Sequence, residues 1–467
     1  MVSASGPSNA HHAMPTLHAR TALTADGWRS GVRLDIDDVG TIAAVTSGVD
    51  TPAFDADVLL PAPTNLHSHA FQRAMAGLTE RRGPEGSDSF WSWRALMYRF
   101  LDRLDPDAVE AIAAYVQMEM LEAGFAAVVE FHYLHHAPDG IPYADVGELS
   151  GRIAAAAHTS GIGLTLLPAL YAAGGCDGRA LEGGQRRFGN DEVRFAAVHE
   201  RAAHALRSLP ADARLGVAAH SLRAVSPREL CVAAALSPEA PFHLHVAEQP
   251  TEVAEVRAAL GARPVEWLLA NHDVDGRWCL IHATHVDAAE RAGLARSGAV
   301  VGLCPITEAN LGDGLFEARK YLDAGGTFGV GSDSNLRVSL AGELRTLEYG
   351  QRLRDGARAV LADHERSTGR RLLEEACAGG ARAAGRPSGR IAPGRLADLV
   401  ALDRRATSLL GTEGDTLIDA FTFAGGDDAV SDVWAAGRRV VSEGRHMRRD
   451  AIESRYRKTV LGLSAPA

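Results

Sequence analysis

Lysine is nearly absent from this chain of 467 residues: only Lys320 and Lys458 occur, and arginine supplies the other positive charges. The net charge of −11 leaves no basic excess to neutralise phosphates, so a nucleic-acid partner is not expected. No apolar run approaches the length of a membrane span, and residues 1–16 lack the charged and apolar regions of a signal peptide. We therefore expect a cytoplasmic protein that binds neither nucleic acid nor membrane.

Cysteine is scarce as well, and its spacing argues against a disulfide framework. The five cysteines are odd in number, scattered along the chain and never in Cys-x-x-Cys spacing. They are expected to be reduced, as is typical of a cytoplasmic protein.

The chain contains regions with two different sequence patterns. Residues 17–62 and 385–467 contain short alternating apolar and polar runs separated by glycine turns, which predict β-strands. Residues 63–384 instead alternate alanine-rich helical segments with short apolar strands. Eight such strands are expected, one just before His67 and the others at 126–131, 163–167, 215–219, 242–246, 278–281, 299–302 and 327–330.

Eight strand–helix alternations predict an α/β fold, a TIM-like (β/α)₈ barrel over residues 63–384, with its active site where the strands end. The two β-rich ends are each too small to fold well alone. They are expected to pair into one flanking β-sandwich, carrying a C-terminal helix over 450–463. Residues 1–16 are expected to be disordered.

The first barrel strand ends in His67-Ser-His69. Residues two apart on a strand point to the same side, so this pair aims two imidazoles at one point. An isolated His-x-His is more often a pair of partly buried or surface histidines with no ligand. Whether this pair binds a metal therefore depends on the residues at the other strand ends.

Metal-ligating residue types recur in order along the later strand ends, as His243-Leu-His245-Val-Ala-Glu248, His282-Ala-Thr-His285 and Asp333. Three imidazoles and a carboxylate are ordinary zinc ligands, with water in an open position. Such a metal lowers the pKa of its water to ~7, which makes hydroxide available at neutral pH.

This order resembles the amidohydrolase superfamily, which has a first-strand His-x-His, histidines on strands five and six, an aspartate on strand eight and a flanking β-sandwich. The resemblance covers nearly the whole chain and includes the pattern from Gly389 to Asp403. It implies that His243 is structural and that the metal ligands are His67, His69, His245 and Asp333.

The scarcity of lysine limits the expected metal centre. Binuclear members of the superfamily bridge two metals with a carboxylated lysine, and no lysine precedes Lys320 in this chain. We therefore expect one Zn²⁺ per subunit, although the same ligand set accepts iron or manganese. A bridging glutamate or cysteine would escape this reasoning.

Five longer strings resemble the formimidoylglutamate deiminase family: Asn65–Leu78, Asp88–Tyr98, Glu130–His136, His220–Val225 and Thr307–Gly314. The resemblance implies hydrolysis of N-formimidoyl-L-glutamate to N-formyl-L-glutamate and ammonia, a step of histidine degradation. It also implies a homodimer.

The resemblance further assigns roles to individual residues. Glu248 would deliver a proton to the leaving nitrogen. His282 would help to deprotonate the attacking water or stabilise the tetrahedral intermediate, and His285, a second candidate in the same loop, is expected to be structural. Asp333 would act both as ligand and as hydrogen-bond acceptor for that water. Arginine grips carboxylates bidentately, so the dicarboxylate substrate would be bound by Arg94, Tyr133, His220 and Arg223.

Two other readings stay open. A related deaminase acting on a guanine, cytosine or adenosine type of ring would need aromatic and amide contacts in place of two arginines. A catalytically inactive barrel that serves as an assembly subunit would not need the intact ligand set.

Overall fold

The eight strands predicted over residues 63–384 are all present and run parallel in one sheet, in the order β13-β12-β11-β10-β9-β7-β6-β5. The short strand β8 (Arg214–Leu215) pairs with β7 beside this path. In this computed structural model, which describes residues 16–80, 93, 97, 98 and 100–464, the predicted barrel is therefore confirmed. Its strands are β5 (Thr64–Ser68), β6 (Ala127–His132), β7 (Gly163–Leu170), β9 (Val217–Ser221), β10 (Phe242–Val246), β11 (Trp278–His282), β12 (Val300–Leu303) and β13 (Thr327–Val330).

The barrel closes where β13 returns to β5. One isolated parallel bridge, between Ser68 and Asp333, joins the two segments. The helix α12 (Thr368–Ala383) packs against both strands. A Cβ atom on Gly379 of this helix would lie 1.9 Å from the carbonyl oxygen of Phe328, so the close packing of helix and strand requires glycine.

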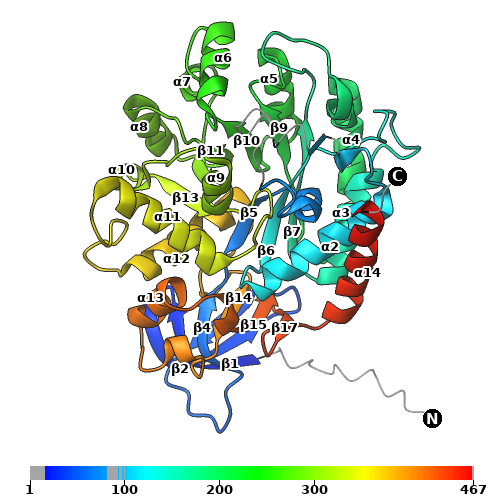
Figure 1. The fold of residues 1–467 in the computed structure, drawn as a ribbon. Coiled ribbons are helices and arrows are strands. Elements are labelled where there is room, and N and C mark those ends of the chain that lie inside the picture. Colours follow the sequence, from blue (N-terminus) through cyan, green and yellow to red (C-terminus); the bar gives the residue numbers. More distant parts are fainter. Residues whose placement is uncertain (1–15, 81–92, 94–96, 99, 465–467) are drawn as a thin grey trace, which may run out of the picture.

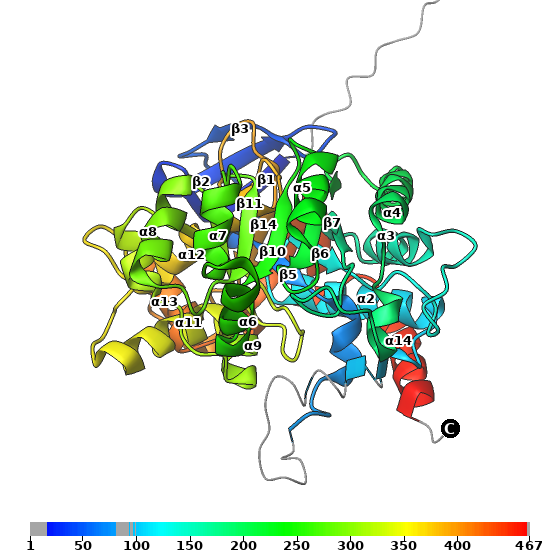
Figure 2. The ribbon, with the colours of Figure 1, turned by 90° about the horizontal axis from the view of Figure 1, so that it is seen from above.

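Helices surround the strands when the molecule is seen from above (Figure 2). Local sequence sets their starts, as at α5, where Ser226 and Glu229 cap each other's backbone N–H groups and Pro227 occupies the first turn. The helices are α2 (Pro106–Glu122), α3 (Glu148–Ser160), α4 (Glu192–Leu206), α5 (Pro227–Leu236), α6 (Pro250–Leu260), α7 (Pro264–Asn271), α8 (Ala288–Ser297), α9 (Pro305–Leu311), α10 (Ala318–Asp323), α11 (Leu340–Asp355), α12, α13 (Asp415–Phe423) and α14 (Arg449–Ser464), with 3₁₀ turns η1 (Ala70–Met75), η2 (Gly183–Arg187), η3 (Thr407–Leu409) and η4 (Asp427–Ala429).

The two ends of the chain share a second, mostly antiparallel sheet below the barrel in Figure 1. It curls on itself, because Ala397 accepts a hydrogen bond from Gly437 N and donates one to Gly40 O, which links two distant turns. The sheet encloses a small core of its own that includes Leu34, Ile42 and Leu399. Its strands are β1 (Thr16–Thr24), β2 (Gly27–Ile36), β3 (Ile42–Thr46), β4 (Ala56–Pro61), β14 (Leu399–Leu402), β15 (Val430–Ala435), β16 (Arg438–Ser442) and β17 (Arg445–His446).

The antiparallel pairing of β4 with β14 confirms that the two ends form one flanking β-structure. The predicted domain boundaries at 62/63 and 384/385 stay predictions. Of the segment expected to be disordered, residues 1–15 lie outside the described residues and Thr16 begins β1. The C-terminal helix α14 lies beside α2, and Tyr456 stacks on Tyr115 at 3.8 Å between ring centroids (Figure 1). No helix in the described part of the chain is long and apolar enough to cross a membrane.

Candidate metal centre and active site

Three imidazoles and one carboxylate converge at the ends of β5, β10 and β13. The Nε2 atoms of His67, His69 and His245 lie 3.0–3.3 Å from one another, and Asp333 Oδ1 lies 3.4 Å from His67 Nε2 and 3.3 Å from His69 Nε2. All four side chains are buried. The structure thus brings together the four residues predicted as metal ligands.

Backbone carbonyls orient two of these imidazoles. Nδ1 of His69 donates to Phe131 O at 3.0 Å, and Nδ1 of His245 donates to His220 O at 2.8 Å, because a carbonyl oxygen can only accept. The proton on Nδ1 leaves the lone pair of each Nε2 facing the other ligands. Burial lowers the pKa of His69 to about 3 and holds that of His245 well below its ordinary value, so both rings are neutral.

This donor set fits a divalent metal. Lone pairs that face one another across 3.0–3.3 Å repel unless a cation lies between them. A tetrahedral zinc site with Zn–N bonds of 2.0–2.1 Å places its ligand atoms about 3.3 Å apart, which matches the observed spacing. The spacing of these four residues therefore fits a bound divalent metal ion.

Several strand ends turn sharply at the site. Ala247, His282 and Asp333 have φ values of 51°, 68° and 47°, in the left-handed region that side chains other than glycine rarely adopt. After β10, the buried Glu252 carboxylate accepts the N–H groups of Ala247 (3.1 Å) and Glu248 (3.0 Å), which stabilises the turn. Such strain concentrates where a fold holds functional side chains in place.

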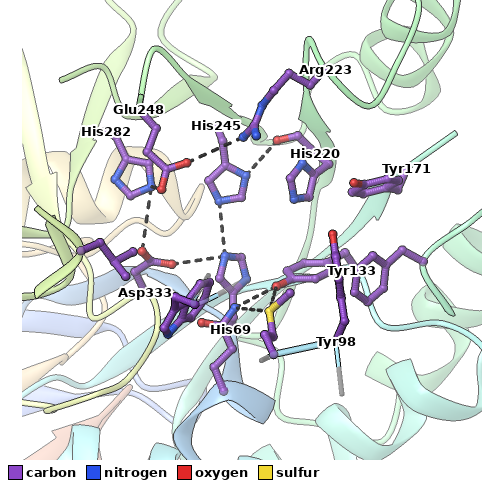
Figure 3. Close-up of a pocket in the computed structure, with 15 residues that line it drawn as sticks. His69, Tyr98, Tyr133, Tyr171, His220, Arg223, His245, Glu248, His282 and Asp333 are labelled. Atoms are coloured by element: carbon purple, nitrogen blue, oxygen red, sulfur yellow. Dashed lines mark hydrogen bonds and ion pairs between the residues drawn. The ribbon is translucent and has the colours of Figure 1, made fainter. Parts of the chain in front are cut away.

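Beside the imidazole cluster lies an acid–base group, in which the His282 ring stacks on that of His245 at 5.7 Å between centroids. His282 Nε2 is 3.8 Å from Glu248 Oε1 and 3.9 Å from Asp333 Oδ2 (Figure 3). Its Nδ1 is 3.2 Å from Glu308 Oε1. Burial alone would lower the pKa of His282, but the neighbouring carboxylates, Glu248 first, raise it to about 10. Burial raises the pKa of Glu248 to about 7, against the opposing charges of His282 and Arg223.

A cavity opens in front of these groups. Arg223 Nη2 lies 3.8 Å from Glu248 Oε2, and His220 and Tyr133 line the same wall (Figure 3). Arg94, the fourth predicted substrate-binding residue, lies outside the described residues. His285 is not among the described residues that line the cavity, and its ring nitrogen Nε2 donates to Asp313 O at 2.7 Å.

Comparison with known proteins identifies the family. The Amidohydrolase family model matches residues 58–440, and the model described as "Formimidoylglutamate deiminase HutF, N-terminal domain" matches residues 14–56. Formimidoylglutamate deiminase of Pseudomonas aeruginosa is 49% identical over 437 residues, which covers 93% of this chain and 96% of that protein. The chain belongs to the formimidoylglutamate deiminase family.

Other relatives are consistent with this family and its fold. The crystal structure of an amidohydrolase from Brucella melitensis has a TM-score of 0.91 at 49% identity, and the match covers 96% of this chain and 100% of that one. A 5-methylthioadenosine/S-adenosylhomocysteine deaminase from Natronomonas pharaonis is only 28% identical, with coverage of 92% and 90%. An adenosine deaminase from Xanthomonas campestris with bound zinc shares the fold, with a TM-score of 0.79 at 21% identity, covering 96% and 98%.

Several residues in or next to the cavity have no role predicted from the sequence. Glu308 lies in the Thr307–Gly314 string, five residues after the end of β12, and a search for polar residues after each barrel strand could have indicated it. Gln72 lines the cavity, and its Nε2 donates to Tyr133 Oη at 2.8 Å. From the sequence alone, its position just after the His-x-His motif is equally consistent with a role in the site and with a role at the start of a helix. No pattern indicated that Tyr171 and Phe188, from the loops after β7, complete the wall.

Proposed function

We propose that this chain hydrolyses N-formimidoyl-L-glutamate to N-formyl-L-glutamate and ammonia in histidine degradation. In this reaction a water oxygen bonds to the formimidoyl carbon, the bond from that carbon to the imino nitrogen breaks, and the nitrogen leaves as ammonia. The observation that carries the proposal is the convergence of His67, His69, His245 and Asp333 beside an acid–base pair, in a cavity that also contains Arg223.

The residues that would hold the metal are these three histidines and Asp333, and we propose Zn²⁺ at one ion per chain. When bound, the metal supplies a Lewis acid that lowers the pKa of a water molecule to ~7. Lys320 pairs with Glu317 at the surface, so it does not supply a bridge to a second metal. His282, Cys304 and Glu308 also have ligand atoms within 4.8 Å of one another. Metal analysis by mass spectrometry therefore tests the stoichiometry: one zinc per chain is expected, and two would contradict it.

Proton transfer is assigned to the acid–base group. His282 Nε2 and Glu248 Oε1 face each other at 3.8 Å, a separation that one water or a small rotation bridges. In the proposal the positive charge of His282 favours deprotonation of the water and stabilises the tetrahedral intermediate. Asp333 accepts a hydrogen bond from the water, and Glu248 relays the proton from the water to the departing nitrogen.

Substrate binding is assigned to cationic and polar groups on the cavity wall. The guanidinium of Arg223 matches a carboxylate in charge and geometry, and Tyr133 and His220 add hydrogen-bonding groups beside it. Arg94 is proposed for the other carboxylate on sequence resemblance. The predicted homodimer and cytoplasmic location remain predictions, which light scattering and cell fractionation would test.

A ring deaminase is the second candidate, because Tyr98, Tyr171 and Phe188 give the cavity an aromatic wall and Gln72 provides an amide. Ammonia release from N-formimidoyl-L-glutamate, S-adenosylhomocysteine, guanine and cytosine distinguishes the two. Turnover of the linear amidine alone is expected. Faster turnover of any of the ring compounds would overturn the proposal. Failure to bind zinc, with no activity on any substrate, would favour an inactive barrel.

A further inference from the structure

Three of the predicted metal ligands lie where the first and last strands of the barrel meet and close it. His67 lies near the end of β5 and His69 directly follows it, and Asp333 follows β13, the last strand of the barrel. His69 N donates to Asp333 O at 3.0 Å and Asp333 N donates to His67 O at 2.9 Å, around the single bridge between the two segments. Three of the four ligands therefore depend on one short pairing, and Figure 3 shows His69 and Asp333 side by side across it.

Side chains reinforce this pairing. Asn65 on β5 donates from Nδ2 to Ser332 Oγ at 2.6 Å and accepts from Ser332 N at 3.0 Å. Ser332 Oγ in turn donates to Asn335 Oδ1 at 2.6 Å. Asn335 Nδ2 lies 3.1–3.2 Å from three acceptors, which are Ser68 Oγ, His69 O and Asp333 O. We call Asn65, Ser68, Ser332 and Asn335 the seam network.

The seam network spans both segments without touching the cavity. All four side chains are buried, with relative exposures of 0–1%, and none lines the cavity. Asn335 contacts the backbones of two ligand residues, His69 and Asp333, at once. It is thus placed to fix the distance between ligands without coordinating the metal.

The backbone at the seam is held in unusual geometry. Asp333 and Asn335 have φ values of 47° and 54°, and a Cβ atom on Gly331 would lie 2.8 Å from the backbone nitrogen of His67. Conformations of this kind persist only where surrounding contacts over-determine them. The hydrogen bonds of Ser332 and Asn335 are contacts of that type.

We infer that the seam network positions His67, His69 and Asp333 for the metal, with Asn335 as the central positioning residue. The network holds three ligand atoms at coordinating distance before the metal arrives, so its loss lowers metal affinity. This inference rests on the metal site of the proposed function and not on the identity of the substrate. The competing explanation is that these buried polar groups only satisfy one another and stabilise the barrel.

Zinc affinity of the full-length protein separates the two explanations. Apo-protein variants Asn335→Ala and Asn335→Gly would be titrated with zinc in competition with a chromogenic chelator. Glycine tolerates positive φ and alanine does not, so a loss common to both reports the missing amide and not backbone strain. Asn271→Ala is the matched control, since Asn271 makes one hydrogen bond at the exposed end of α7.

The Kd for zinc is expected to rise about 10- to 100-fold in both Asn335 variants and to stay unchanged in the control. The zinc-induced rise in Tm should shrink in parallel, and excess zinc should restore kcat with KM unchanged. A zinc Kd within about twofold of the parent, with a lowered apo Tm, would overturn the inference, because tenfold is the smallest expected effect.

If the Asn335 variants do not fold, the milder variant Ser332→Ala, which loses a single hydroxyl, replaces them. A raised zinc Kd in this variant would support the inference, and an unchanged zinc Kd with a lowered apo Tm would overturn it. The outcome is independent of the proposed deimination, since zinc binding is measured without substrate. A parent protein that binds zinc tightly but leaves formimidoylglutamate intact would reject the proposed activity and still allow the seam to be tested.

Discussion

In the metal half of the site, His69 and His245 donate their Nδ1 hydrogens to backbone carbonyls, whereas in the adjacent acid–base half His282 Nδ1 faces the carboxylate of Glu308. Burial lowers the pKa of the first two rings, and the carboxylates around His282 raise its pKa to about 10. The same side chain is thus neutral and ready for a cation in one half of the site, and holds a proton in the other. Burial and the charges of neighbouring carboxylates, and not the residue type, decide the role of each histidine.

The largest effect is expected from replacing a metal ligand. His245→Gln should lose zinc and lower kcat/KM by about 10⁴-fold or more, because the metal contributes several kcal/mol of catalysis. His243→Gln is the matched control: His243 lies on the same strand and donates to Ala383 O at 2.8 Å, away from the ligands. Zinc content by mass spectrometry and steady-state kinetics check both. Equal zinc content in the two variants would contradict the ligand assignment.

A substitution in the acid–base half should lower the reaction rate without lowering the zinc content. Glu248→Gln keeps the shape of the side chain but removes its proton affinity, so kcat should fall about 10²- to 10³-fold at full zinc occupancy. Glu239→Gln, at an exposed position, is the control for the substitution itself. Unchanged turnover in zinc-loaded Glu248→Gln protein would remove Glu248 from the mechanism.

A finer test of the difference between the two halves replaces the partner of His282 and leaves His282 itself unchanged. Glu308→Gln leaves a hydrogen-bonding group near Nδ1 but removes the charge, so the imidazole should hold its proton less tightly and kcat should fall about tenfold. Zinc content should not change, in contrast to His245→Gln. An effect on zinc Kd as large as that on kcat would instead place Glu308 in the metal half.

The last prediction concerns pH and needs no substitution. Burial raises the pKa of Glu248 to about 7, so the fraction of carboxylate, the form that accepts a proton, decreases as the pH falls below that value. In the parent protein kcat/KM should therefore drop about tenfold per unit below about pH 7. Rates would be measured between about pH 5 and about pH 8 with zinc content verified at each point. A flat profile there would show that the carboxylate form of Glu248 does not limit the reaction.

Much of the site follows from periodicity along the sequence. The two-residue repeat of a strand placed His67 and His69 on one side of β5, and their Nε2 atoms lie 3.1 Å apart. The same rule could not choose between His243 and His245, because both point into the barrel. The structure separates them by depth: His243 contacts Ala383 of α12, and His245 reaches the ligand cluster.

Other contacts have no local signature. Asn65 and Ser332 are 267 positions apart and meet only because the last strand of the barrel returns to the first. Glu308 reaches His282 from a different strand end, and its buried carboxylate has no spacing rule relative to that imidazole. Such pairs depend on barrel closure, which a list of strands and helices does not specify.

By itself, the sequence determined the strand count, the order of polar residues at the strand ends and the absence of a lysine bridge, because these are properties of local spacing and composition. Only the tertiary structure decided which histidine is neutral, which is charged and which side chains hold the ligands in place. Those properties depend on burial and on partners from distant segments, and both arise only when the barrel closes at the seam between β5 and β13.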